Sequence, residues 1–242
     1  MTNTIIIKLT PQETLKLPLA RFGILQGLVY ALLHYDSSYS REIHNKKDED
    51  GDDAIKLFSF SDLRGQRRCE NMQLHYHGSA LFEIRSPEER LIETVAARLA
   101  ADNTVVINGC PCTVDAVRTG EAPLATESCT YLMNTPITVY HTPHNSRCFL
   151  SPDEEAFGTT VQNNLLKKYE MVYGKPYTGP LRFETAEVGK RDKCVTRYKG
   201  GYITAYYGTY RLTADEDMQR VAYLCGFGGK NSAGFGFPLA VC

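Results

Sequence analysis

The sequence predicts an α+β fold made of two tandem ferredoxin-like halves, and three observations support this prediction. Segments of the first half follow the order strand, helix, strand, strand, helix, strand, which is the order of a ferredoxin-like unit. The second half repeats this order less regularly. The polar stretch TGEAPLATES at 119–128 separates the halves. We therefore place one domain at residues 1–120 and the other at residues 121–242.

Hydrophobic periodicity defines the elements of the first half. Alternating apolar residues predict strands, and apolar residues three and four apart predict helices. The strands are expected at 3–10, 55–61 and 72–86, and the helices at 17–35 and 86–101. Ser86 and Pro87 suit the first turn of the second helix. Asn108-Gly109 is a two-residue turn signal, so 104–117 is predicted to fold as a hairpin.

The second half contains the same kinds of segment in a less regular order. The strands are expected at 129–140, around 181–188, 193–198 and 202–212, and at 235–241, and the helices at 151–174 and 215–225. The first of these helices follows a Ser-Pro pair that can cap it. The duplication lies in the pattern alone, because the residues of the two halves do not repeat.

The composition excludes several classes of protein. No segment approaches the ~18 apolar residues of a membrane span, and the N-terminus lacks a signal-peptide pattern. We therefore expect a cytoplasmic protein that makes no membrane contact. The eight cysteines include no C-x-x-C pair and are expected to be reduced thiols. His75 and His77 alternate on a strand without a partner ligand, so neither a metal nor another cofactor is expected.

A glycine-rich segment, GFGGKNSAGFGFPLAVC, closes the chain from Gly226 to Cys242. Such a loop can bring backbone N–H groups to an anion, and Lys230 adds a positive charge. A mononucleotide loop would need glycine where Leu224 stands and Ser or Thr where Asn231 stands. A dinucleotide fingerprint would need the order strand, loop, helix, which is reversed here. The expected ligand is therefore phosphate-bearing but belongs to neither nucleotide class.

Positive charge is concentrated in one part of an otherwise neutral chain. The formal net charge is −1, yet residues 175–211 contain eight Lys or Arg against three acidic residues. A local excess of this kind can hold a polyanion.

Taken together, these segments resemble the CRISPR repeat-processing endoribonucleases of the RAMP superfamily. The segment GFGGKNSAGFGFPLAV resembles the glycine-rich signature that closes those proteins. LQGLVYALL resembles their first helix, REIHNKK with IKLFSFSDL the segment after it, and YGTYRLTADEDMQRVAYLC their last strand and helix. The segments occur in the family's order. The resemblance implies two ferredoxin-like (RNA-recognition-type) domains, in agreement with the pattern above.

The resemblance also implies an activity, namely cleavage of precursor CRISPR RNA within each repeat without a metal. The ribose 2′-OH would attack the adjacent phosphate and leave a 2′,3′-cyclic phosphate and a 5′-OH end. The implied partner is repeat RNA, with a CRISPR effector complex or a second copy of the chain as further partners. One alternative is a non-catalytic RAMP-type RNA-binding subunit of an effector complex. A more distant alternative is an unrelated protein that binds a small phosphorylated ligand.

The family's catalytic Tyr, His and Lys fall on Tyr30, His44 and Lys56. A histidine suits proton transfer near neutral pH, and a lysine can stabilise negative charge on the phosphate. Between His44 and Lys56 lies an acidic stretch longer than the family pattern suggests, so Lys46 or Lys47 stays an alternative to Lys56. Read without the resemblance, the three residues would be a loop histidine, a core aromatic and a strand-end lysine. His34 is the reserve histidine.

The resemblance assigns RNA binding to two regions. In the glycine-rich segment the candidates are Gly226, Gly228, Gly229, Lys230, Asn231, Ser232, Gly234 and Gly236. Near the paired strands of the second half they are Lys190, Arg191, Lys193 and Arg197. Basic side chains would contact phosphates. Tyr206, Tyr207 and Tyr210 are candidates for stacking on bases, with core packing as the alternative.

Overall fold

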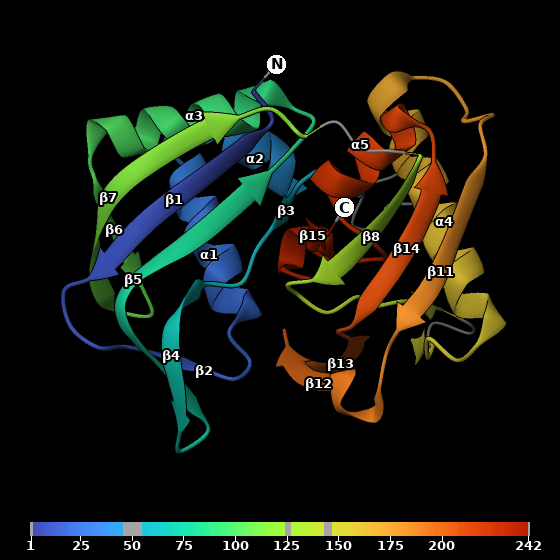
Figure 1. The fold of residues 1–242 in the computed structure, drawn as a ribbon. Helices are drawn as coiled ribbons and strands as arrows, with labels where there is room; N and C mark the ends of the chain where they lie inside the picture. The colour runs from blue at the N-terminus through green and yellow to red at the C-terminus, as the bar shows by residue number, and fades with distance from the viewer. Residues whose placement is uncertain (1, 46–54, 124–126, 143–146, 242) are drawn as a thin grey trace.

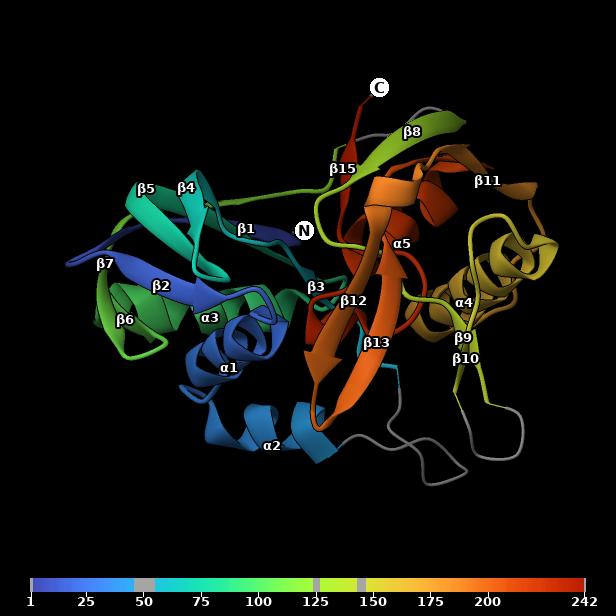
Figure 2. The ribbon, with the colours of Figure 1, turned by 90° about the horizontal axis from the view of Figure 1, so that it is seen from below.

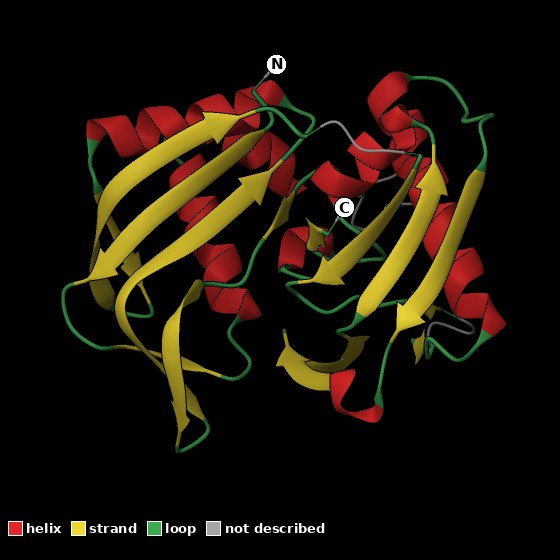
Figure 3. Cartoon of the chain, in the orientation of Figure 1, coloured by secondary structure: helices red, strands yellow, loops and turns green. Residues whose placement is uncertain are grey.

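A computed structural model describes residues 2–45, 55–123, 127–142 and 147–241. It confirms the α+β fold: two antiparallel sheets lie side by side, and the helices lie behind them in the view of Figure 1. Each half contains its own strands and helices (Figure 3). In the part of the chain that is described, no helix is long and apolar enough to cross a membrane.

The strands of the first sheet lie between residues 4 and 120, and the long strand β5 pairs with β1, β2, β3 and β4. The strand order of this sheet is β2-β5-β1-β7-β6, and β3 and β4 lie off this path. The strands are β1 (Thr4–Pro11), β2 (Leu15–Pro18), β3 (Ser59–Phe60), β4 (Arg64–Glu70), β5 (Gln73–Arg85), β6 (Thr104–Ile107) and β7 (Cys110–Gly120). The predicted turn is confirmed, because Asn108 and Gly109 both have positive φ between β6 and β7.

Helices α1 (Phe22–Leu33) and α3 (Glu89–Ala101) cover one face of this sheet, and α2 (Ser37–Asn45) packs against α1 on the side away from the sheet (Figure 2). Ile5, Ile7 and Leu9 of β1 are buried in the core beneath them, while Lys8 is exposed on the open face. The alternation in TIIIKLTP therefore separates core from solvent as expected for a sheet covered on one side.

The second sheet has the order β11-β14-β8-β15. Its strands are β8 (Ser128–Met133), β11 (Leu181–Glu187), β14 (Thr209–Ala214) and β15 (Pro238–Ala240), and its helices are α4 (Glu155–Tyr173) and α5 (Glu216–Cys225). Asp215 caps α5 by accepting a hydrogen bond from the Met218 backbone N–H at 3.0 Å. Two small hairpins complete this half: β9 (Tyr140–His141) with β10 (Cys148–Phe149), and β12 (Lys193–Tyr198) with β13 (Gly201–Tyr206).

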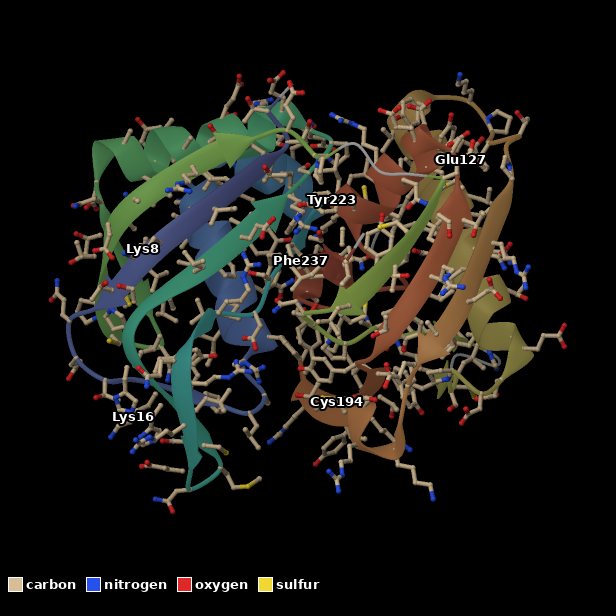
Figure 4. The ribbon with its side chains drawn as sticks, in the orientation of Figure 1. Lys8, Lys16, Glu127, Cys194, Tyr223 and Phe237 are labelled. Atoms are coloured by element: carbon tan, nitrogen blue, oxygen red, sulfur yellow. The ribbon has the colours of Figure 1, made fainter. Side chains whose placement is uncertain are left out.

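A buried arginine joins the two sheets. The Arg85 guanidinium lies between two rings of the second half, 3.6 Å from the Tyr223 centroid and 4.0 Å from the Phe237 centroid. Its Nε donates to Glu83 at 2.7 Å, and Nη1 donates to the Pro238 carbonyl at 2.8 Å. Figure 4 shows the two rings in the gap between the sheets. Stacking and hydrogen bonds compensate for the burial of this charge.

Several short elements were not expected from the sequence. The polar helix α2 lacks an apolar stripe long enough to be recognised. The strand β2 buries Leu15 and Leu17 against the first core, β4 is exposed, and both pair with β5. The two-residue strand β10 was also missed. The strand expected at 55–61 was too long, since only Ser59 and Phe60 pair with β5. The expectation of reduced thiols was wrong at Cys129, which is disulfide-bonded.

Candidate active site and glycine-rich loop

Tyr30 and Lys56 meet at the edge of the first core. The Lys56 ammonium donates a hydrogen bond to the Tyr30 hydroxyl at 3.2 Å and lies 5.7 Å from the centre of the ring. The Tyr30 ring also meets the Phe58 ring edge-on, with centroids 6.3 Å apart. Tyr30 is on α1, at the border of the buried face formed by Leu25, Leu28, Val29, Leu32 and Leu33. Two candidates that are 26 residues apart in the sequence are therefore in contact.

His44 occupies the last turn of α2, but its side chain is outside the described part of the structure. Figure 2 shows α2 beside α1, the helix that carries Tyr30. A pocket opens next to this helix and is lined by Glu42, Ile43, Lys56, Leu57, Phe58, Glu88 and Leu91. The alternative lysines Lys46 and Lys47, and the acidic stretch that follows them, fall outside the described residues.

Helix α2 is attached to the start of α3. The Tyr39 hydroxyl donates to Glu88 at 2.7 Å, and the Arg90 guanidinium lies 4.4 Å from the Tyr39 ring centroid. Arg90 also pairs with Asp36 at 2.7 Å, and the hydrogen bonds from Ser38 and Arg90 hold the pKa of Asp36 well below its usual range. Burial and the neighbouring Glu88 raise the pKa of Tyr39 far above its usual value, so this hydroxyl is a donor at neutral pH.

The remaining histidines are dispersed. His34 ends α1 and is exposed, while His75 and His77 lie on β5 of the first sheet and His141 on β9. His144 falls outside the described residues. Within the ranges that are described, no group of three His, Cys, Asp or Glu could hold a metal ion.

The glycine-rich loop packs inside the protein. Phe227, Phe235 and Phe237 are fully buried, and so are four of the five glycines in this segment. A side chain at Gly236 (φ +70°) would place Cβ 2.0 Å from the Phe227 carbonyl oxygen, and one at Gly234 would place it 2.9 Å from the Phe60 ring. The glycines therefore permit close contacts within the loop and between the loop and the first half.

A buried lysine from α4 organises the loop. Lys168 Nζ donates to the Gly226 carbonyl at 2.8 Å, to the Gly228 carbonyl at 3.0 Å and to Asn231 Oδ1 at 2.7 Å. Burial lowers the pKa of Lys168 to about 7. Sequence reasoning missed this residue. The sequence feature that could have identified it is the helical spacing, which places Lys168 on the same buried face as Val161 and Leu165.

Burial narrows the set of loop residues that could reach RNA. Gly226, Gly228, Gly234, Gly236 and Asn231 are buried, unlike the open cradle expected from the sequence. The partly exposed members of the loop are Gly229, Lys230 and Ser232. Lys230 Nζ lies 5.5 Å from the Tyr140 ring centroid, and the Ser232 carbonyl accepts from Gln26 of α1 at 2.8 Å. The hydrogen bond from Gln26 ties the loop's outer surface to the helix that carries Tyr30, and the Lys230 contact ties it to β9.

The β12–β13 hairpin carries the second group of candidates. Lys190 and Arg191 precede it in a short 3-10 helix, Lys193 and Arg197 lie on β12, and all four are exposed. Of the two roles considered for Tyr206 and Tyr210, core packing is the one found, because both are buried against Phe157. Tyr207 is half-buried, and burial raises its pKa to about 12.

Tyr202 is an exposed aromatic that sequence reasoning overlooked. It is 73% exposed and faces Arg197 directly across the hairpin. The alternation of side chains along the strand could have indicated its exposure, because Ile203 and Ala205 on the same strand are buried on the opposite face. One face of the hairpin therefore presents a cation beside an aromatic ring.

Comparison with known proteins adds independent information. Residues 121–238 match the family described as CRISPR associated protein Cas6, C-terminal. A CRISPR-associated endoribonuclease Cas6 of Methanocaldococcus jannaschii is 27% identical over 227 residues, which cover 90% of this chain and 84% of the relative. A CRISPR-associated endoribonuclease Cas6 of Pyrococcus furiosus is 26% identical over 239 residues, which cover 96% and 87%.

Solved structures share the fold over the whole chain. A CRISPR associated protein Cas6 superposes with a TM-score of 0.82 at 24% identity and full coverage of both chains. A Cas6-related protein from Pyrococcus furiosus reaches a TM-score of 0.86 at 16% identity, covering 100% of this chain and 99% of the other. The tandem ferredoxin-like architecture of this chain is thus also that of these solved structures. The C-terminal family match, the two relatives aligned over most of the chain and the shared fold together support a CRISPR repeat-processing protein of the Cas6 type, whose residues 121–238 form the Cas6 C-terminal domain.

Proposed function

We propose that this protein is a metal-independent endoribonuclease that cleaves precursor CRISPR RNA within its repeats. The proposal is carried by the contact between Lys56 and Tyr30, which joins two of the three candidate catalytic residues. The names of the curated relatives, CRISPR-associated endoribonucleases, support the same activity. The ribose 2′-OH attacks the scissile phosphate and produces a 2′,3′-cyclic phosphate and a 5′-OH end.

Each candidate has a role that follows from its chemistry. His44 transfers a proton to or from the reacting oxygens, because an imidazole changes its charge near neutral pH. Lys56 places positive charge beside the phosphate as negative charge develops on the non-bridging oxygens. The Tyr30 hydroxyl accepts a hydrogen bond from Lys56 and can donate its own proton to a phosphate oxygen or to the 2′-OH.

RNA binding is assigned to the exposed cations and the exposed ring of the second half. Lys193 and Arg197 would contact phosphates, and Tyr202 would stack on an unpaired base. One structural neighbour with a TM-score of 0.84 at 16% identity is described as a RAMP protein that binds different RNA substrates. This description concerns that protein and supports the same class of ligand here.

The test is cleavage of candidate CRISPR repeat RNAs in the presence of EDTA. We expect cutting at one position per repeat and a cyclic phosphate end that resists phosphatase until acid opens it. His44→Ala is expected to lower the cleavage rate by about 10²–10⁴-fold. His34→Ala, which changes the exposed histidine at the end of α1, is the matched control and should cut normally.

The outcomes separate the proposed enzyme from its alternative. Binding of repeat RNA without cutting by the wild-type protein would identify a non-catalytic RNA-binding subunit of an effector complex. Cutting that His44→Ala leaves unchanged would contradict the catalytic assignment and retain the activity.

A further inference from the structure

Three basic side chains form a row across the open face of the first sheet. Lys16 on β2 pairs in register with His75 on β5, and His75 pairs in register with Arg68 on β4. Since side chains alternate between faces along a strand, residues that are directly opposite share one face. The neighbouring residues Leu74 and Tyr76 are buried on the other face. The row therefore points away from the core, on the side of the sheet that no helix of the first half covers.

Lys16 and Arg68 are exposed at the two ends of this row. Within the described residues, no carboxylate lies within ion-pair distance of either side chain. The central His75 does lie beside an acidic group, since its Nδ1 is 3.6 Å from Oε2 of Glu70. Lys16 and Arg68 therefore present two positive charges without a carboxylate partner in the described part of the chain, one on each side of His75. Two such charges on one open face can hold the phosphates of a polyanion supplied from outside the chain.

The row lies at the same end of the molecule as the RNA-binding candidates of the other half (Figure 4). The hairpin formed by β4 and β5 and the hairpin formed by β12 and β13 project from the same end of the molecule (Figure 1). Seen from that end, β2 and the β12–β13 hairpin are both in the foreground (Figure 2). An extended polyanion that leaves one hairpin can therefore continue toward the other.

We infer that the Lys16–His75–Arg68 row is a second binding site for the phosphate backbone of single-stranded RNA. This inference rests on the proposed function for the identity of the polyanion. Lys16 and Arg68 contact successive phosphates, and His75 between them donates a hydrogen bond to the same strand. The site adds affinity at a distance from the cleavage chemistry, and phosphate contacts alone give it no sequence preference.

The experiment compares two double variants that each remove two positive charges. Lys16→Gln/Arg68→Gln removes the ends of the row. Lys167→Gln/Arg98→Gln removes one positive charge on α4 and one on α3, outside the row and outside the basic stretch at 175–211. Fluorescence anisotropy measures the affinity for a repeat RNA with a 2′-deoxy substitution at the scissile position, over a series of salt concentrations. Cleavage of the unmodified RNA is measured separately with saturating enzyme, and circular dichroism confirms that both variants fold.

Loss of the row should weaken binding about tenfold at low salt and should reduce the slope of log affinity against log salt by about 1.4, because each contact with a single strand contributes about 0.7. The helix control should retain the wild-type slope, and both variants should cut at the wild-type rate when saturated. An unchanged slope in the row variant, or an equal loss in the control, would overturn the inference. A wild-type protein that binds without cutting would contradict the proposed function alone, and the difference in slope would still test the row.

Discussion

The glycine-rich loop and the Tyr30–Lys56 site differ in how they stand out in the sequence and in what the structure does with them. The loop is conspicuous as a sequence, yet most of it is buried and its glycines face other protein atoms. The site consists of ordinary residues on a helix and a connecting segment, yet it brings an ammonium and a phenol into contact beside a pocket. The conspicuous glycine-rich motif therefore reflects the close packing of the loop. The candidate catalytic residues become recognisable only when the structure shows that they are in contact.

The loop and the site should therefore respond differently to substitution. Substitutions in the loop should change the free energy of unfolding, and substitutions at the site should change the cleavage rate while the fold stays intact. The loop also adjoins the site, because its Ser232 carbonyl is bound by Gln26 on the same helix as Tyr30. Variants of each region therefore test how far the stability of the loop and the activity of the site are independent.

The largest effect is expected for Gly236→Ala. The added Cβ would lie 2.0 Å from the Phe227 carbonyl oxygen, a contact that the surrounding core cannot relieve without moving. We expect a loss of more than about 4 kcal/mol in the free energy of unfolding, measured by urea denaturation. Gly174→Ala is the matched control, since Gly174 has a similar φ of +67° but open space around it. That control should cost about 1 kcal/mol, and similar losses in the two variants would contradict the packing role.

Lys168→Met should be next in size. The methionine fills a similar volume but leaves the Gly226 and Gly228 carbonyls without their donor in a buried site. The expected cost is about 3 kcal/mol. Lys167→Met changes the exposed neighbour on the same helix and should stay within about 0.5 kcal/mol of the wild type. Equal stability of the two variants would show that the loop does not depend on the buried ammonium.

The same lysine predicts how stability depends on pH. Burial lowers the pKa of Lys168 to about 7 in the folded protein, whereas an unfolded lysine keeps its proton to about 10.4. Above pH 7 the unfolded state therefore binds more protons, and the free energy of unfolding rises with pH.

Between pH 7 and 9 the stability difference between wild type and Lys168→Met should grow by roughly 2 kcal/mol. Urea denaturation at several pH values measures it. The window ends at 9 because the buried Cys225 thiol, whose pKa is raised to about 12, has the opposite effect above its ordinary pKa. A difference that shrinks with pH would contradict the lowered pKa of Lys168.

Tyr30→Phe should have the smallest energetic effect and the most selective one. It removes the hydroxyl that Lys56 contacts and keeps the ring that packs against Phe58. We expect the single-turnover cleavage rate to fall about tenfold, equivalent to ~1.4 kcal/mol in the barrier, with the urea midpoint unchanged. Tyr35→Phe, at an exposed tyrosine just after α1, is the control. A loss of stability that matches the loss of rate would place Tyr30 with the structural residues.

Local signals in the sequence predicted much of the fold. The helices α1, α3, α4 and α5, the central strands and the Asn108-Gly109 turn follow from periodicity and turn chemistry, and the structure confirms them. The sequence could not predict α2, because a nine-residue polar helix is held by tertiary contacts such as Tyr39 with Glu88. The strands β2 and β4 were missed because they depend on pairing with β5.

The candidate site was predictable only in part. Tyr30 and Lys56 were identified by resemblance, and their contact required the structure because a helix and an undescribed segment separate them in the chain. The buried role of Lys168 and the row formed by Lys16, His75 and Arg68 depend on a helix face and on strand register. A sequence does not state strand register, and so cross-strand neighbours could not be inferred from it.

The guanidinium that joins the sheets has a consequence for how the molecule comes apart. Arg85 belongs to the first sheet, but both of its flanking rings and its carbonyl acceptor at Pro238 belong to the second half. Melting the second half would leave this cation with Glu83 alone, and melting the first half would expose both rings to water. We therefore expect a single calorimetric transition in which the two halves lose their structure together, rather than two separate melting events.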